Sequence, residues 1–475
     1  MPNSTGHRSN TLFSTGDENT RLQRYEQHVK QAFANIESVL QQVSALQHET
    51  DFVNRAQKLS QDKLGFKLPE LLLADCWIKP LDIGQLYAWC VFETVRGMSQ
   101  EFYTEQPIKL QDEDAFQAFL QECGFHTMDV SPCADGRLAH VISYVLRLPY
   151  KAVRRKSYAG AMFDVEDSLQ KWVKTEMFRH REAKPNAASE PTQYLKAAVY
   201  HFSSVKPDSE GCAAHGSDVV VAANAANERL NAFRQGVENT FCCGASIDLL
   251  LIGVDTDTDA IRLHLPNAQG EIDTEFYIDA LQLASSRMSV NGTDESSLID
   301  YLSRQTKEFL SSQPSIGMLR LAARLLSGNL RQIEYVRQYH NGSYQDIGHQ
   351  ECFIGMGIGF EEIQLRNLTY FAYLKTVEEG AKDMDVGIKI FTGLNASRGL
   401  PIPVVIRFDY HGQVPGAKER AIQRCAQLNE ALRQRYKDYV EQGLLHTMQM
   451  IRDCNANTQA EVVDCSVAVT RQEMH

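Results

Sequence analysis

The chain has 475 residues, of which 43% are hydrophobic and 23% are charged, as in an ordinary globular protein. Asp and Glu number 60 against 48 Lys and Arg, and the resulting net charge of −12 argues against a nucleic-acid-binding protein, which needs a basic surface. No apolar run is long enough for a membrane span, and the Ser- and Thr-rich start does not resemble a secretory signal. Eleven cysteines, an odd number scattered over a long chain, favour reduced thiols that are free to bind metal.

The apolar pattern divides the chain into four segments. Residues 1–20 hold almost no aliphatic side chains, so we expect them to be disordered. Residues 21–110 repeat apolar side chains at three- and four-residue steps, which predicts a helical domain. Residues 111–348 alternate short apolar runs with helical stretches, as an α/β domain does. Residues 349–475 follow a Gly-rich boundary and form a last segment.

The spacing of apolar residues also predicts individual helices and strands. Helices are predicted at 22–46, 52–65, 81–98, 112–123, 218–239, 297–340 and 418–442. Buried strands are predicted at 141–148, 195–202, 247–254, 387–391 and 404–408. The tail after Asn455 is expected to be loosely ordered. Residues 243–264 resemble residues 383–408 in pattern, each an aliphatic run followed by polar turn residues, and we interpret this as a degenerate duplication.

Three residues stand where an α/β protein places a site. Cys133 lies in the turn-rich stretch SPCADGRLAH, His201 ends the apolar run AAVYHF, and Cys212 follows in a loop with Pro and Gly. Two thiolates and one imidazole form a catalytic type of zinc site, which leaves the fourth position open for water. Structural sites more often use CxxC pairs, which this chain lacks. From spacing alone, the alternative of three unrelated residues stays open.

Other Cys and His residues are weaker candidates. Cys242 and Cys243 are adjacent and precede a predicted strand, and adjacent side chains of an extended chain point to opposite sides, so both seldom bind one ion. His140 and His215 are close to the motifs in sequence, but nothing in the pattern assigns either a role.

A carboxylate and a guanidinium follow Cys133 at alternate positions, as Asp135 and Arg137. In an extended segment these three side chains share one side. An Arg can hold a carboxylate with two hydrogen bonds, and an ionised Asp beside a metal-bound water can accept its hydrogen bond or block the fourth position. The alternative is a surface ion pair of little energetic value.

The pattern CxDxR, followed by a His and then a Cys, resembles the zinc site of the β-class carbonic anhydrases. It is most similar to the carboxysomal shell branch, once called the epsilon class, which spaces its His and second Cys as widely as this chain does. The resemblance covers about residues 50 to 450 and rests on the segments 124–138, 191–217, 241–262, 344–351 and 385–403.

The resemblance implies a role for each matching residue. Cys133, His201 and Cys212 correspond to the ligands of one Zn²⁺ per subunit, and Asp135 with Arg137 corresponds to the catalytic dyad. His349, in the stretch DIGHQE, matches a His that lines the active-site region. The implied fold is α/β, with a helical N-terminal domain, a β-carbonic-anhydrase-like catalytic domain and a degenerate C-terminal copy without metal ligands.

The implied activity is that of a carbonate dehydratase, a lyase that interconverts carbon dioxide and bicarbonate through attack by zinc hydroxide. Asp135 would orient the hydroxide and Arg137 would fix Asp135, whereas a state with Asp135 on the metal would be inactive. Members work inside the α-carboxysome, a bacterial microcompartment in the cytoplasm, where carbon dioxide feeds Rubisco. They form homodimers, which in some members assemble further. For this chain, the composition leads us to expect no nucleic-acid and no membrane partner. In relatives a disordered N-terminal segment can tether the enzyme to Rubisco. The corresponding stretch here has only about 20 residues, so a shortened tether and an unstructured end without a partner both stay open.

Two other functions are possible for a chain with these residues. A zinc deaminase needs HxE and a later PCxxC, whereas His201 is followed by Phe and Ser, and Cys133 by Ala, Asp and Gly. A catalytically silent shell or scaffold protein is the other alternative. It would be expected to lack a ligand or the dyad, and all five residue types are present.

Overall fold

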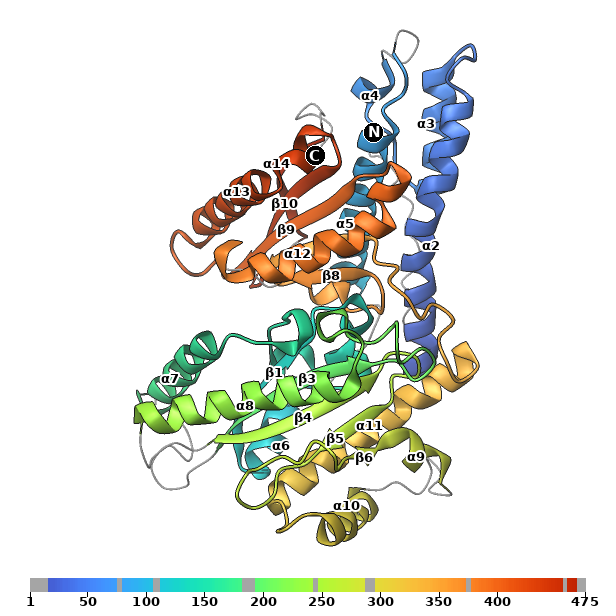
Figure 1. Ribbon diagram of the computed structural model, residues 1–475. Helices are drawn as coiled ribbons and strands as arrows, with labels where there is room; N and C mark the ends of the chain where they lie inside the picture. The colour runs from blue at the N-terminus through green and yellow to red at the C-terminus, as the bar shows by residue number, and fades with distance from the viewer. Residues whose placement is uncertain are drawn as a thin grey trace. The chain divides into compact units, whose positions relative to one another are not determined.

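The computed structural model describes residues 16–74, 79–105, 112–181, 193–241, 247–286, 295–372, 377–455 and 459–467. The chain forms two compact units (Figure 1). We call residues 110–348 the middle unit, and residues 1–109 together with 349–475 the terminal unit. Within the described ranges, no helix combines the length and apolar character needed to cross a membrane.

A six-stranded sheet forms the core of the middle unit. Its strands are β1 (Phe125–Pro132), β2 (Arg154–Arg155), β3 (Gln193–Phe202), β4 (Ile247–Asp255), β5 (Ile261–His264) and β6 (Ile278–Asp279). Their order is β2-β1-β3-β4-β5-β6; the first four are parallel, and β5 and β6 are antiparallel to their neighbours. β3 and β4 are buried along almost their whole length, which explains why the sequence shows them as continuous apolar runs.

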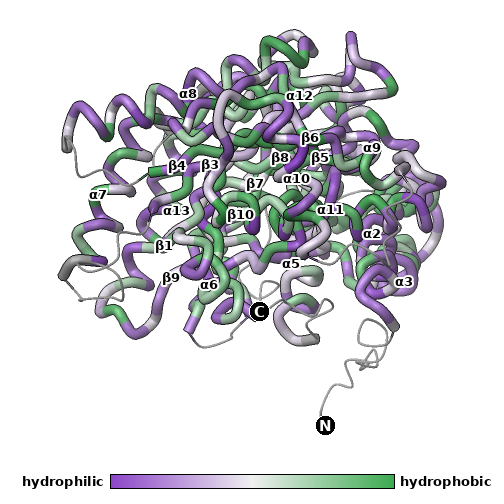
Figure 2. Tube along the Cα trace, turned by 90° about the horizontal axis from the view of Figure 1, so that it is seen from below, coloured by the Kyte–Doolittle hydropathy of each residue, from purple (hydrophilic) through white to green (hydrophobic). Residues whose placement is uncertain are grey.

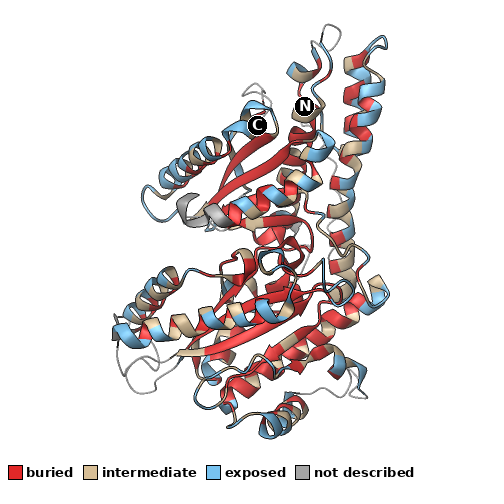
Figure 3. Ribbon diagram, in the orientation of Figure 1, coloured by how far each residue is buried: buried red, intermediate tan, exposed pale blue. Residues whose placement is uncertain are grey.

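Helices surround this sheet. They are α6 (Glu113–Glu122), α7 (Val165–Arg181), α8 (Val219–Phe241), α9 (Ala280–Ser285), α10 (Glu295–Phe309) and α11 (Ile316–His340). α8 packs on β3 and β4 and against α7, while α11 packs on β5. Hydrophilic and hydrophobic residues alternate along α8 (Figure 2), and the strands are more completely buried than the helices (Figure 3), as expected for a sheet covered by amphipathic helices.

The terminal unit joins the two ends of the chain around a second sheet. Its strands are β7 (Phe353–Ile358), β8 (Thr369–Ala372), β9 (Ile402–Tyr410), β10 (Leu445–Asp453) and β11 (Glu461–Cys465). Its helices are α2 (Glu18–Ala45), α3 (Phe52–Leu64), α4 (Glu70–Ala74), α5 (Ile83–Glu105), α12 (Val377–Leu394), α13 (Ala417–Arg435) and α14 (Lys437–Glu441). α5 packs on β9 and β10, α2 packs against α3 and α5, and α12 and α13 contact β9. The mixed α/β fold with a helical N-terminal region is therefore confirmed.

The two sheets repeat one strand order. β2-β1-β3-β4-β5 in the middle unit corresponds to β8-β7-β9-β10-β11 in the terminal unit. In both, the first four strands are parallel and the fifth is antiparallel. This repetition supports a duplication, but not the one read from the sequence. Residues 383–394 lie in α12, and the strand that corresponds to β4 is β10.

Two predicted strands are helical. Residues 387–391 lie in α12, where Met384, Ile388 and Phe391 are buried at four- and three-residue steps, so the period is helical. The run 141–148 begins with the π-helix Val141–Val145, which packs against α11. A short run buried on all sides cannot be assigned to strand or helix from periodicity alone.

Both predicted disordered ends are partly ordered. Residues 18–20 begin α2, whose N-cap Asp17 accepts a hydrogen bond from the Thr20 amide at 2.8 Å. Residues 1–15 lie outside the described residues. Near the other end, β11 pairs with β10, contrary to the expected loose tail, while residues 456–458 and 468–475 are outside the described part.

Charged side chains are buried near the end of β9. Arg407 is fully buried and forms an ion pair with Glu362, and its Nε donates to Oδ1 of Asp409 at 2.6 Å. The Tyr103 hydroxyl donates to Oε2 of Glu362 at 2.7 Å. Aligned on the last pair of the two central strands, Phe202–Asp255 and Tyr410–Asp453, Asp409 takes the position that His201 has in β3.

Candidate metal centre

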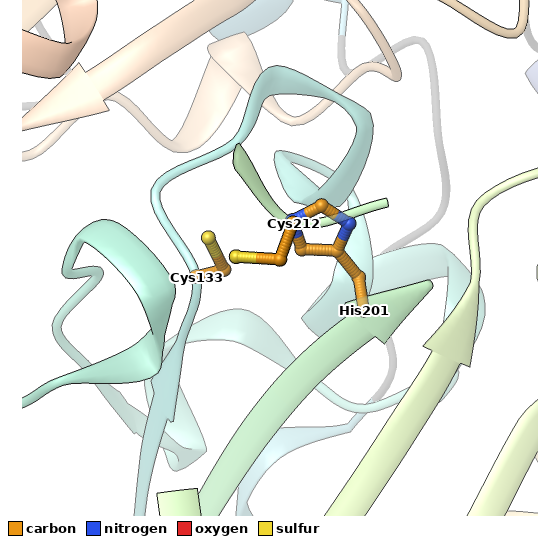
Figure 4. Close-up of side chains that lie close together, drawn as sticks. All are labelled: Cys133, His201 and Cys212. Carbon is orange, nitrogen blue, oxygen red and sulfur yellow. The ribbon is translucent and has the colours of Figure 1, made fainter. Parts of the chain in front are cut away.

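The structure brings together the three residues predicted to bind metal. Cys133 directly follows β1, His201 is the next-to-last residue of β3, and Cys212 lies in the loop after β3. One ligand atom of each residue lies within 4.8 Å of the others (Figure 4). β1 and β3 are parallel neighbours, and the Cys133 amide donates to the Val199 carbonyl at 3.0 Å, so their carboxyl ends meet at one edge of the sheet.

Backbone contacts fix the loop that carries Cys212. The amides of His215 and Ser217 both donate to the Cys212 carbonyl at 3.0 Å. A Cβ on Gly211 would lie 2.7 Å from the Ser217 carbonyl oxygen, so the tight turn requires glycine. The start of the loop is tied to the end of β4, because Oδ2 of Asp257 accepts the Val205 amide at 2.8 Å.

The environment of the three side chains suits a soft cation. Cys133, His201 and Cys212 are only 5%, 1% and 3% exposed. Neither ring nitrogen of His201 has a hydrogen-bond partner among the described residues, which is unusual for a buried imidazole. Two sulfurs and one imidazole nitrogen fit zinc with one position left open.

A hydrogen bond links the two thiols and shifts their pKa values in opposite directions. The hydrogen bond with Cys212, together with burial, raises the pKa of Cys133 well above its usual range. The same hydrogen bond lowers the pKa of Cys212, as do the backbone amides of Ala214 and His215. The shift of Cys212 favours its thiolate, the form that binds metal.

Asp135 and Arg137 form a buried ion pair beside these residues. Arg137 Nε donates to Oδ1 of Asp135 at 2.9 Å, and Nη2 donates to Oδ2 at 2.8 Å. The exposed fractions are 6% and 1%, so the alternative of a surface ion pair is wrong. The expected extended backbone is also wrong beyond Asp135, which is the N-cap of the short 3-10 helix Gly136–Leu138 and accepts the Arg137 amide.

Arg137 also contacts the Cys212 loop. Its Nη1 donates to the carbonyl oxygens of Glu210 and Ile347, and its Nη2 is 3.4 Å from that of Gly211. Because these carbonyls accept the remaining donors, the guanidinium is held in one orientation, with its other edge toward Asp135.

The remaining predicted candidates have other surroundings. His349 belongs to the terminal unit, where its Nδ1 lies 2.9 Å from Oε1 of Glu351, and its role in catalysis stays a prediction. His215 Nε2 is 3.0 Å from the Gly160 carbonyl oxygen. Cys242 and Cys243 lie outside the described residues.

Sequence reasoning missed a group of acidic residues beside the site. Asp255, Asp257 and Asp259 form the run VDTDTDA at the end of β4 and are all buried. Asp257 holds the Cys212 loop, and Nε2 of His140 lies 2.8 Å from Oδ2 of Asp259. An alternating acidic run directly after a buried strand was the available signal, since acidic residues seldom follow a buried strand without a structural or functional partner.

Comparison with known proteins identifies one family over almost the whole chain. The family model of the carboxysome shell carbonic anhydrase catalytic domain matches residues 115–349, and the N-terminal and C-terminal models match residues 12–103 and 350–467. The chain belongs to the carboxysome shell carbonic anhydrase family. Membership confirms the family likeness seen in the CxDxR segment, and its three-part organisation agrees with the mixed α/β fold.

Individual relatives are similar over most of their length. The carboxysome shell carbonic anhydrase of Prochlorococcus marinus is 51% identical over 461 residues, which is 96% of this chain and 89% of the relative. That of Parasynechococcus marenigrum is 52% identical over 96% of this chain and 79% of its own length. The protein of Halothiobacillus neapolitanus is more distant, at 44% identity over 90% of this chain and 85% of its own.

Proposed function

We propose that this carboxysome shell carbonic anhydrase is a zinc-dependent carbonate dehydratase that interconverts carbon dioxide and bicarbonate. The observation that carries the proposal is the convergence of Cys133, His201 and Cys212, buried and beside a bidentate Asp–Arg pair, in a chain of this family. When bound by these residues, zinc supplies a nucleophile at neutral pH because it lowers the pKa of water to about 7.

Asp135 acts on the attacking solvent molecule. Its Oδ2 lies 3.4 Å from Nε2 of His201, so the carboxylate reaches the place where the ligands converge. There it accepts a hydrogen bond from the nucleophile and turns a lone pair toward carbon dioxide. Arg137 holds the carboxylate by both oxygens and keeps it from taking a ligand's place.

The location follows the names of the relatives, and the partners are those that the family resemblance implies. We place the protein in the carboxysome, where dehydration of bicarbonate supplies carbon dioxide to Rubisco. Each subunit binds one Zn²⁺, the subunits pair as homodimers, and His349 assists at the active site. The alternative is a catalytically silent scaffold of the shell with the same fold.

Stopped-flow hydration of carbon dioxide separates the two functions. The full-length zinc-loaded chain is expected to accelerate hydration, and treatment with a chelator is expected to abolish the rate, which added zinc restores. A protein that holds one zinc ion per chain, is folded and yet gives only the uncatalysed rate would overturn the enzymatic function in favour of the scaffold.

A further inference from the structure

A short segment of the middle unit, residues 343–348, lies against the Asp135–Arg137 pair. The Ile347 carbonyl accepts a hydrogen bond from Arg137 Nη1 at 3.0 Å. Carbonyl oxygens of Glu210 and Gly211 are the other backbone acceptors described for this guanidinium. The orientation of Arg137 therefore depends on where residue 347 is held.

Tyr344 anchors this segment to the turn after β4. Its amide donates to the Asp257 carbonyl at 2.8 Å, and its hydroxyl donates to Oδ2 of Asp259 at 2.8 Å. The ring is only 2% exposed and lies 4.5 Å, centroid to centroid, from the His340 ring. Tyr344 is thus held through both its backbone amide and its side-chain hydroxyl, three residues before Ile347.

Asp259 connects that segment to the turn that carries Arg137. Besides the Tyr344 hydroxyl, its Oδ2 accepts from Gln332 Nε2 at 2.9 Å and lies 2.8 Å from Nε2 of His140. His140 follows Arg137 by three residues, directly after the 3-10 turn. The buried Asp259 carboxylate therefore contacts both chain segments that flank the Arg137 guanidinium: the turn that ends at His140 and residues 343–348.

We propose that Tyr344, through Asp259, is a positioning residue for the Asp135–Arg137 pair. By fixing the Ile347 carbonyl, it keeps in place the second backbone acceptor of Arg137 Nη1, beside the Glu210 carbonyl, and leaves Nε and Nη2 to hold Asp135. Without the hydroxyl the segment moves, the guanidinium turns, and the carboxylate is no longer presented to the solvent nucleophile. The inference rests on the proposed function, because it concerns the efficiency of the same site.

Tyr344→Phe in the full-length, zinc-loaded chain tests the role. We expect kcat for hydration to fall about tenfold, as for other partners that orient catalytic groups. KM and the zinc content should stay near those of the wild type, since neither the ligands nor the substrate is touched. Amide hydrogen exchange of the 343–348 peptide in the metal-free protein should become faster, a readout independent of catalysis.

Tyr194→Phe is the matched control. Tyr194 is equally buried in the middle unit, and its hydroxyl donates to Oδ2 of another buried aspartate, Asp129, at 2.8 Å. The control removes a bond of the same kind and is expected to lower the unfolding temperature by a similar amount, with kcat unchanged. If kcat falls equally in both variants, the loss in Tyr344→Phe reflects general destabilisation of the middle unit, and the proposal is overturned.

Asp259→Asn provides a second variant, because it keeps an oxygen acceptor of the same size for the Tyr344 hydroxyl. Because Asp259 also contacts His140, the variant should lower kcat as well, and a wild-type kcat in Asp259→Asn would contradict the inference. Wild-type kcat and exchange in Tyr344→Phe would overturn it as well. A wild-type chain without hydration activity would instead overturn the proposed function, so the two failures are distinguishable.

Discussion

Nε2 of His201 lies 3.4 Å from Oδ2 of Asp135, so one carboxylate oxygen borders the candidate ligand set. Arg137 donates a hydrogen bond to each of the two carboxylate oxygens. Asp135→Asn keeps the size of the side chain but loses the negative charge, and the amide cannot accept through both positions. We expect kcat to fall about 100-fold or more while zinc stays bound.

Stopped-flow kinetics and metal analysis of the same preparation check this expectation. Activity near that of the wild type in Asp135→Asn would show that the carboxylate does not orient the nucleophile. Loss of zinc together with activity would instead make Asp135 part of the metal binding.

Removal of a predicted ligand should remove the metal. Cys133→Ala is expected to reduce zinc from about one ion per chain to a small fraction, because only two of the three protein ligands remain. Cys90→Ala is the control, since Cys90 is a fully buried thiol of α5 in the terminal unit, outside the Cys–His–Cys group. Metal analysis after dialysis distinguishes them, and equal zinc contents would refute the assignment of Cys133.

Gly211 is expected to be intolerant of even a methyl group. A Cβ there would meet the Ser217 carbonyl at 2.7 Å, so Gly211→Ala must shift the turn that positions Cys212. We expect zinc affinity to fall about tenfold. Gly97→Ala in α5, where a Cβ meets nothing within 4 Å, should leave the affinity unchanged, as a competition titration with a chelator would measure.

Acid should destabilise the middle unit partly through His264. Burial lowers the pKa of His264 to about 4, against 6.5 for the unfolded chain. Between these pH values the His264 imidazole is protonated in the unfolded state and neutral in the folded state. The free energy of unfolding therefore falls as the pH drops from 6.5 to 4. The loss amounts to a few kcal/mol and is absent above about pH 7.

His264→Gln removes this titration while keeping a polar side chain beside the Tyr200 hydroxyl, which lies 2.9 Å from Nε2 of His264. Denaturant unfolding at several pH values should show a shallower dependence on pH in the variant between 4 and 6.5. Identical slopes in variant and wild type would mean that His264 does not contribute.

The sequence predicts the candidate site residues more completely than it predicts the helices and strands around them. β3 and β4 appear as uninterrupted apolar runs because both faces are covered, and parallel strands bring Cys133 and His201 to one edge. The strand predicted at 387–391 is wrong, because the helical period of these residues emerges only with Met384, which lies outside the short run. The contact between Tyr344 and Asp259 joins residues 85 positions apart, and no motif marks such a pair.

The repeated strand order gives the two halves different ways of balancing buried charge. In the middle unit two thiols and an imidazole converge, and a dissociable ion would complete the balance. At the corresponding edge of the terminal sheet, the guanidinium of Arg407 lies between Glu362 and Asp409, so the positive charge belongs to the polypeptide itself. If the middle unit holds zinc as proposed, we expect a chelator to lower the unfolding temperature of that unit and to leave that of the terminal unit unchanged.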